Sequence, residues 1–270
     1  MSEVNEAGTR TAARTYLQMI RAELLKLTRK RSIVGTAAFL SIGTIVLYYA
    51  VLEIQHLTSP GSYGPAGGLD HFDNTLGFLG IYFGALAAIL IGTEAGTTDT
   101  ASGAFRDLVV TGRSRLALFA VRVPAALLVT LALGLAALGV SIAATFAFAG
   151  GLATPGVSFV LDGVLWVCAA QLVVCAVAVG VGGLTGSRAA SLTILIAWQV
   201  LAGRVLARAT VLGDARDAVP NLALGALKPG QPLTDNYGLT MSAGIAVAVL
   251  AAWVVVWLAL GARKTLVRDA

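Results

Sequence analysis

Six long apolar runs, separated by shorter polar segments, dominate the pattern of hydrophobic and polar positions along this chain. A run of about 20 apolar residues, coiled as an α-helix, crosses the roughly 30 Å hydrocarbon core of a bilayer. The fifth run is shorter, because its roughly 15 residues cover only about 22 Å as a helix. We therefore expect an all-α integral membrane protein with six transmembrane helices, at residues 33–52, 76–93, 123–149, 164–184, 189–203 and 241–262.

The composition supports this class. Hydrophobic residues make up 57% of the chain and charged residues 12%, whereas a soluble domain carries about 25% charged residues. The 270 residues provide six spans with modest loops and leave no room for a separate soluble domain. We therefore expect one transmembrane domain over residues 32–262, followed by a basic tail at 263–270.

The segment before the first span is amphipathic. Residues 1–14 are polar and predict a disordered N-terminus, and residues 15–31 predict a helix with lysine and arginine on one arc. The apolar arc of this helix holds Tyr16, Leu17, Ile20, Leu24 and Leu27. This pattern is typical of a helix that lies in the membrane interface. The alternative is a basic flank that only orients the first span.

Basic residues predict the orientation of the chain. Fifteen of the nineteen lysines and arginines fall in the N-terminal segment, in residues 94–122, at Arg188 and in the tail. Positively charged loops stay in the cytoplasm. We therefore expect a multi-pass protein of the cell (inner or plasma) membrane with both termini and residues 94–122 in the cytoplasm. The excess of basic residues is explained by this topology, so we expect no nucleic-acid partner.

Residues 94–122 form a polar, basic island between the second and third spans. Asp99 or Thr100 can cap a short helix there, because their side-chain oxygens can accept backbone N–H groups of a first turn. Ser114 can cap the helix that follows. The apolar face of the short helix would hold Phe105, Leu108 and Val109, with Arg106 off that face.

Two readings of this island stay open. A short helix with an apolar face, exposed to the cytoplasm, needs a groove in which to dock, and the alternative is a plain turn on the membrane surface. Glu94, at the start of the island, can pair with Arg106, Arg113 or Arg115. It can equally be a solvated surface acid.

Polar residues within or near the later spans are candidates for a transport pathway or an outer vestibule. They are Tyr82, Trp198, Gln199, Arg204 and Arg208. The alternatives are a helix–helix hydrogen bond for Gln199 and, for the two arginines, side chains that extend to the outer headgroups. Residues 209–240 follow; their apolar run at 219–227 is too short to span and can dip into the outer leaflet and return.

Motifs for chemistry are scarce. The chain has no phosphate-binding loop of the form G-x-x-x-x-G-K-[ST] and no H-E-x-x-H. Its two histidines, His56 and His71, lie in the loop after the first span without zinc-type ligand spacing. Cys168 and Cys175 are seven residues apart on one helix, about 10.5 Å, which is too far for a disulfide. We expect a non-catalytic chain without a metal or cofactor of its own.

Together these features resemble the permease subunits of the type-two ABC exporters. In that family the loop between spans 2 and 3 carries a coupling helix, often begins with a glutamate and ends near a Ser-Arg pair. Glu94 and Ser114-Arg115 match these positions, and Arg122 stands where the family often has a lysine. The family's interfacial elbow helix resembles residues 15–30, and its outer re-entrant element resembles 219–227.

The resemblance implies a function. A second permease subunit, identical or different, would complete the pathway within the membrane lipids, and two copies of a separate ABC ATPase would hydrolyse ATP with Mg. Exported substrates in the family include drugs, peptides, lipids and glycans, and some members confer antibiotic self-resistance. By this resemblance, the residues that couple to the ATPase are Glu94, Asp99, Phe105, Arg106, Leu108, Val109, Arg113 and Arg115.

Two other classes stay open. One is a six-span secondary transporter or membrane scaffold that is not coupled to an ATPase. The other is a membrane enzyme that acts on lipid, with its site at the loop of His56 and His71.

Overall fold

The computed structural model describes residues 2–101, 114–234 and 238–267, and these residues form helices and loops without a strand. Six helices in the described part of the chain are long and apolar enough to cross a membrane, which confirms the expected all-α membrane protein. Most of them begin or end several residues beyond the apolar runs. They are Arg31–Thr58, Leu69–Asp99, Arg115–Ala147, Val157–Thr185, Arg188–Arg208 and Ala243–Val267.

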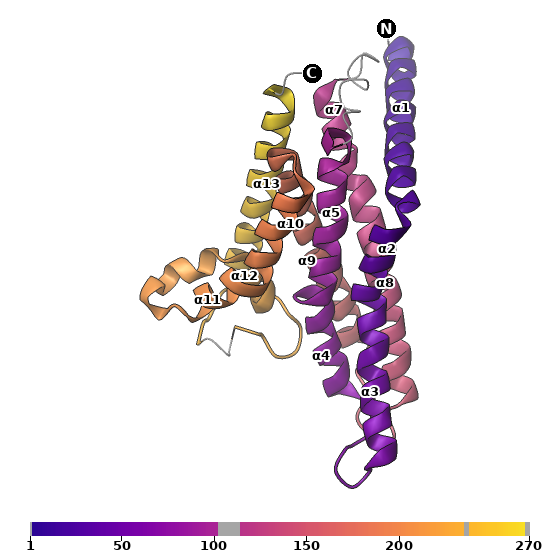
Figure 1. Ribbon diagram of the computed structural model, residues 1–270, viewed down its shortest axis with the longest axis vertical. Helices are drawn as coiled ribbons and strands as arrows, with labels where there is room; N and C mark the ends of the chain where they lie inside the picture. The colour runs from indigo at the N-terminus through magenta and orange to yellow at the C-terminus, as the bar shows by residue number, and fades with distance from the viewer. Residues whose placement is uncertain (1, 102–113, 235–237, 268–270) are drawn as a thin grey trace.

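Several spans are built from shorter pieces (Figure 1). The first joins α2 (Arg31–Ala38) to α3 (Thr44–Thr58) through a π-helical turn, and the second joins α4 (Leu69–Gly80) to α5 (Phe83–Ala101). The remaining helices of the spans are α7 (Arg115–Ala120), α8 (Arg122–Ala147), α9 (Val157–Thr185), α10 (Arg188–Ala197), α11 (Gly203–Arg208) and α13 (Ala243–Val267).

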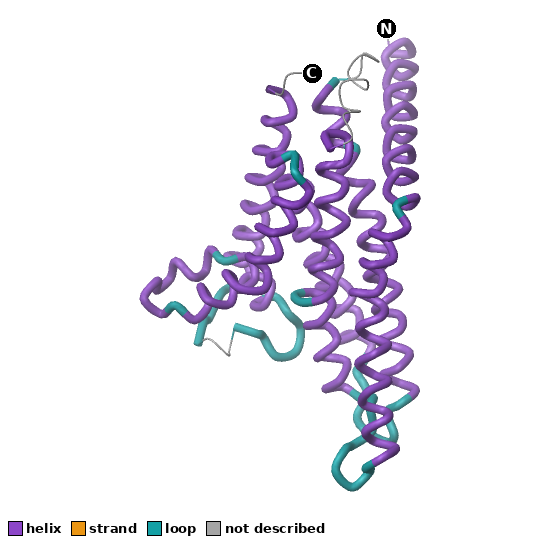
Figure 2. The backbone as a smooth tube through the Cα atoms, viewed as in Figure 1, coloured by secondary structure: helices purple, strands orange, loops and turns teal. Residues whose placement is uncertain are grey.

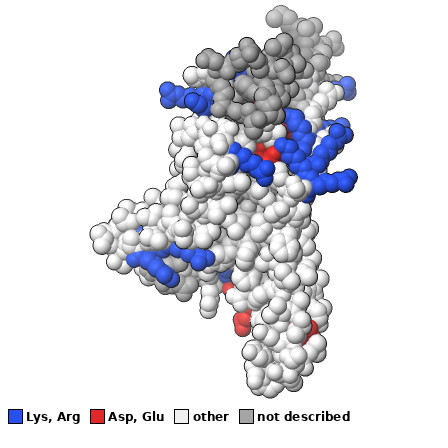
Figure 3. All heavy atoms as spheres, in the orientation of Figure 1, with Lys and Arg blue, Asp and Glu red and all other residues white. Residues whose placement is uncertain are grey.

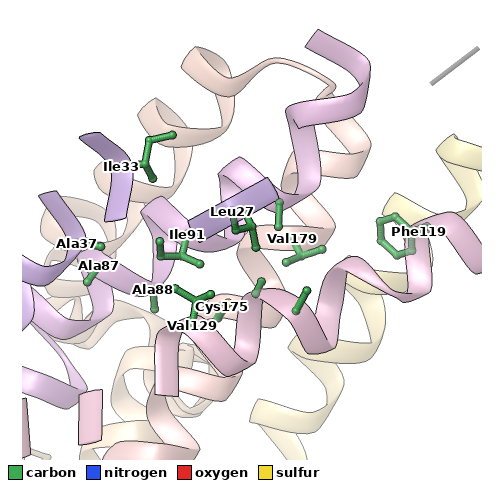
Figure 4. Close-up of a cluster of buried hydrophobic side chains, with 13 residues drawn as sticks. Leu27, Ile33, Ala37, Ala87, Ala88, Ile91, Phe119, Val129, Cys175 and Val179 are labelled. Atoms are coloured by element: carbon green, nitrogen blue, oxygen red, sulfur yellow. The ribbon is translucent and has the colours of Figure 1, made fainter. Parts of the chain in front are cut away.

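Helices α5 and α9 form the centre of the bundle, with α8 and α13 also packed on α9. Small residues let α5 and α9 approach closely, because a Cβ added at Gly96 would lie 2.6 Å from the carbonyl oxygen of Val179. Beside this contact, Leu27, Ile91, Val129 and their neighbours form a buried core between α1, α2, α5, α8 and α9 (Figure 4). Apolar packing in the bundle therefore ties the N-terminal helix to the central spans.

The N-terminal helix differs from the expectation. Helix α1 covers Ser2–Arg29, so the segment predicted to be disordered is helical from Ser2, consistent with its lack of proline. It runs along the long axis of the bundle (Figure 1). Its expected place in the membrane interface stays a prediction. Protein covers the later part of its apolar arc, because Leu27 is buried and Ile20 and Leu24 pack on the same core, whereas Tyr16 and Leu17 are exposed.

Both ends of the chain lie at one end of the bundle, which we call the terminal end (Figure 2). Away from it, between α11 and α13, the chain forms a 3-10 segment and then α12 (Pro220–Ala226). Helix α12 has seven residues, too short to span a bilayer, and its Leu222, Ala223 and Leu224 are buried, in part against α13. The apolar run at 219–227 is thus a short helix packed among the spans.

Candidate functional site

Charged side chains gather near the terminal end of the bundle. Figure 3 shows lysine and arginine side chains around a small acidic patch there. Three members of this cluster are almost fully buried: Glu94 is 4% exposed, Asp99 3% and Arg122 2%. Buried charges are expensive unless they are paired. We call the whole set the ionic network; it consists of Glu23, Lys26, Lys30, Glu94, Asp99, Arg122 and Arg188.

Asp99 of α5 is the central residue in one half of the ionic network. Its Oδ2 accepts a hydrogen bond from Nη2 of Arg122 in α8 at 2.8 Å, and its Oδ1 accepts one from Nζ of Lys26 in α1 at 2.8 Å. Arg122 also donates from Nη1 to the backbone oxygen of Gly96 at 3.3 Å. These contacts fasten α1, α5 and α8 together at one point.

Lys26 shows how strongly this half is paired. Its Nζ also donates to Oε1 of Glu23 at 2.6 Å. Burial lowers the pKa of Lys26, but the hydrogen bonds and charges of Asp99 and Glu23 outweigh burial, so the pKa is raised above its usual value. Lys26 is therefore charged throughout the physiological pH range. Its ion pairs with Asp99 and Glu23 stabilise the fold, and this stabilisation is lost only as the pH rises through the raised pKa of Lys26.

Glu94 of α5 is the central residue in the other half of the ionic network. Its Oε1 accepts hydrogen bonds from Nζ of Lys30, which lies between α1 and α2, and from Oγ1 of Thr98. Its Oε2 forms an ion pair with Nε of Arg188, the first residue of α10, at 3.1 Å. Glu94 therefore ties the start of α10 to α5 and to the junction of α1 and α2.

The network lies where the second span ends and the third begins. Helix α5 ends at Ala101, and Ser114 begins the chain again as the cap of α7, where its Oγ accepts from the backbone nitrogen of Ala117 at 3.2 Å. The predicted cap at Ser114 is thus confirmed. Asp99 and Arg122 lie near these two ends, and their buried ion pair joins the spans on either side of residues 102–113. Lys26 and Arg188, which are partly exposed, extend the network to α1 and α10.

The predicted coupling residues have different outcomes. The expected helix cap at Asp99 or Thr100 is wrong, because both lie inside α5 and the carboxylate of Asp99 is engaged by Arg122 and Lys26. Glu94 is buried, so the solvated alternative is also wrong. Arg115 donates from Nη1 to the backbone oxygen of Leu266 at 3.2 Å. Outside the described residues lie Phe105, Arg106, Leu108, Val109 and Arg113.

Sequence reasoning missed the basic half of the network. The sequence pattern used three of these basic residues, Lys26, Lys30 and Arg188, only as evidence for the topology. Arg122 was noted only because the type-two ABC permeases often have a lysine at that position. The available signal was the position of two carboxylates, Glu94 and Asp99, at the end of an apolar run. Such carboxylates need basic partners when the helix continues through them.

Three of the five predicted pathway or vestibule residues come together away from the terminal end. The guanidinium of Arg204 lies 4.9 Å from the ring centroid of Tyr82. Nε2 of Gln199 donates to the backbone oxygen of Ile81 at 2.6 Å, where α4 gives way to α5. These three side chains line one cleft of ≈ 460 Å³ with Phe78 and Leu86. The bond of Gln199 is the helix–helix contact named as the alternative to a pathway role.

The other two candidates lie apart from this cleft. Trp198 lines a second, mostly apolar pocket, which shares Gln199 with this cleft. Arg208 is exposed at the end of α11. The histidines have local partners: Nδ1 of His56 lies 2.8 Å from the backbone oxygen of Tyr63, and Nδ1 of His71 lies 2.8 Å from the hydroxyl of Tyr48. Within the described ranges, no group of three or more histidine, cysteine or acidic residues could hold a metal ion.

No protein-family model matches this chain, and no curated protein matches it. The resemblance to type-two ABC permeases therefore stays a prediction, and the function is argued from the topology, the ionic network and residues 94–122.

Proposed function

We propose that this chain is the transmembrane subunit of an ATP-driven exporter of the type-two ABC kind and forms half of a translocation pathway. The observation that carries the proposal is the ionic network. It joins the two spans that flank residues 102–113 to each other through Asp99 and Arg122, and to α1 and α10 through Lys26, Lys30 and Arg188.

A coupling segment needs such an attachment. Energy from ATP must enter from another subunit, because this chain has no phosphate-binding loop. A partner that moves residues 102–113 does mechanical work on the spans only if the segment's ends are rigidly held. Buried ion pairs resist separation strongly, since breaking one leaves an uncompensated charge out of water. Drugs, peptides, lipids and glycans are the substrate classes that this proposal includes.

Purification of the full chain from its native membranes tests the proposal. We expect an ATPase with a phosphate-binding loop to co-purify in equal amount, together with a second permease subunit, and ATP hydrolysis in that fraction to be vanadate-sensitive. The control is the same purification from cells that lack the tagged chain. A chain that purifies without an ATPase and transports its substrate on an ion gradient alone would contradict the proposal and favour a secondary transporter.

The proposal requires residues 95–116 and both termini to face the cytoplasm. We expect a cysteine introduced at Ala104, in a chain whose Cys168 and Cys175 are replaced, to react with an impermeant thiol reagent only after the cells are opened. The reason is the charge bias, with fifteen of nineteen basic residues on that side. A cysteine introduced at Gly61 is the control for the other face. Labelling of position 104 in intact cells would overturn this topology.

Arg204→Lys should leave transport and membrane levels unchanged. Arg204 is exposed above the ring of Tyr82, and lysine can both reach the headgroups and place its charge over an aromatic face. Transport by the chain with its co-purified ATPase is the measurement, with Arg208→Lys as the matched control. A large loss in Arg204→Lys alone would show instead that Arg204 grips a planar anionic group with two hydrogen bonds, which lysine cannot do.

A further inference from the structure

A polar pocket of ≈ 300 Å³ adjoins the cleft of Tyr82, because Phe78 and Tyr82 line both. Helix α4 forms one wall of this pocket, and the chain that follows α12 forms another. The pocket and the cleft together form one site with a polar part and an apolar part. The charged and amide side chains that line the polar pocket are Asp73, Asn74, Lys228 and Gln231.

A buried ion pair forms part of the polar pocket. The side chain of Lys228 is 2% exposed, and its Nζ donates hydrogen bonds to Oδ1 of Asp73 and, at 3.3 Å, to the backbone oxygen of Pro229. The Asp73 side chain is 24% exposed, and its Oδ2 accepts no hydrogen bond from the described residues. The pair carries no net charge, but Oδ2 can still accept a hydrogen bond from a hydroxyl group in the pocket.

The guanidinium of Arg204 lies where the polar pocket and the cleft meet. It is 4.9 Å from the ring centroid of Tyr82, which lines both. Arg204 is exposed and forms no ion pair or hydrogen bond with any residue in the described ranges. A guanidinium with open donors suits phosphate oxygens, to which it can donate two parallel hydrogen bonds. The junction of the two parts therefore favours an anionic phosphate group.

The two parts of the site lie at different depths in the membrane. The second span, Leu69–Asp99, has 31 residues, about 46 Å of helix, so about five residues at each end extend past a ~30 Å core. Asp73 of the polar pocket is therefore at the level of the headgroups, and Leu86 of the cleft is near the middle of the span. Phe83 and Val200 of the cleft are exposed, so the cleft opens toward the lipid. A ligand that fills both parts needs a polar end at the membrane surface and an apolar end in the hydrocarbon.

We propose that this site binds one phospholipid whose anionic phosphate carries an uncharged, hydroxylated head. An acyl chain lies in the cleft, the phosphate pairs with Arg204, and the hydroxyl groups of the head enter the polar pocket. Hydroxyl groups both donate and accept, so they match Oδ2 of Asp73 and the amides of Asn74 and Gln231. An ammonium head gains less, because Lys228 already neutralises Asp73. The proposal does not depend on coupling to an ATPase, because it rests on the lining of the site alone.

A matched pair of lipids tests this inference. Phosphatidylglycerol and phosphatidylmethanol with the same acyl chains have the same phosphate charge, but only the first has hydroxyl groups on its head. Each is titrated into the delipidated full chain in detergent micelles, and native mass spectrometry counts the lipids bound. We expect one phosphatidylglycerol per chain to bind about tenfold tighter than phosphatidylmethanol, the gain of a hydrogen bond to a charged group. Equal affinities for the two lipids would overturn the proposal.

A variant of the polar pocket shows where the head binds. Gly77 lines this pocket, and a Cβ added there would meet nothing within 4 Å, so Gly77→Leu fills the pocket without a clash at its Cβ. It should abolish the preference for phosphatidylglycerol and keep the affinity for phosphatidylmethanol. The matched control is Gly139→Leu on the exposed face of α8, where a Cβ also meets nothing. An undiminished preference in folded Gly77→Leu would overturn the proposal.

A variant of the cleft rim tests the phosphate contact. Arg204→Gln removes the charge and should weaken both lipids about tenfold, while the preference for phosphatidylglycerol remains. Arg208→Gln is the control, because Arg208 is an exposed arginine of the same helix that lines neither the polar pocket nor the cleft. Equal lipid affinities of Arg204→Gln and Arg208→Gln would refute the contact between Arg204 and the phosphate.

Discussion

Asp99→Ala should destabilise the folded protein by about 3–5 kcal/mol, the range for removing one partner of a buried ion pair. The substitution leaves Arg122, whose side chain is 2% exposed, without its carboxylate. Lys26 loses the same partner but is 36% exposed at its side chain, so it can turn toward water. The loss should be measured as the shift of the unfolding transition in denaturant, with the protein in mixed micelles.

Two controls make this result specific. Asp214→Ala changes an exposed aspartate of the same chain and should stay within about 0.5 kcal/mol of the original stability. The double variant Asp99→Leu with Arg122→Met removes both charges of the buried Asp99–Arg122 pair and keeps apolar volume, so it should be more stable than Asp99→Ala. Equal effects of Asp99→Ala and Asp214→Ala would show that the network contributes nothing to stability.

The six spans could be predicted because a bilayer imposes a length and a polarity on any helix that crosses it. The ends of the spans could not. Helix α5 continues past Glu94 and Asp99 to Ala101, although two carboxylates in one apolar run normally mark its end. It continues because Lys26, Lys30 and Arg122 neutralise those carboxylates. The two carboxylates show locally that basic partners are needed, but the identity of those partners depends on long-range pairing.

Helix α1 shows a second limit. Its amphipathic pattern shows that one face is covered, but a stripe containing Leu24 and Leu27 fits a lipid surface and a protein groove equally well. The structure covers this stripe with protein, and it places Lys26 and Lys30 where they reach carboxylates 73 and 64 residues away in sequence. Only the tertiary arrangement distinguishes these two environments.

The residues of the cleft of Tyr82, Gln199 and Arg204 could be predicted from the sequence. Polar side chains are few in apolar spans, and each must find a partner inside the bundle or at its edge. Three of the few polar residues in or near the later spans share one cleft. Their partners, such as the ring–guanidinium contact and the backbone oxygen of Ile81, depend on packing.

Phe105→Ala should abolish coupled transport while leaving the chain inserted and folded. Phe105 belongs to the apolar face predicted for residues 100–110, of which residues 102–110 lie outside the described part of the chain. Buried aromatic anchors dominate contacts in which a helix docks into a groove, and truncating one typically costs about 2 kcal/mol or more. That cost corresponds to a roughly thirtyfold loss of affinity for the ATPase.

Variants of the ionic network add to this test, because they distinguish docking of the ATPase from the coupling of its motion to the spans. Phe105→Ala removes the anchor, so the ATPase should fail to co-purify although the unfolding transition is unchanged. Arg106→Ala, off the predicted apolar face, should retain most of the ATPase. Asp99→Ala should instead keep the anchor but loosen the helices behind it, so any ATPase that it still binds should hydrolyse ATP without substrate stimulation. Full co-purification and stimulation in Phe105→Ala would refute docking through this face and return residues 102–113 to an ordinary turn on the membrane surface.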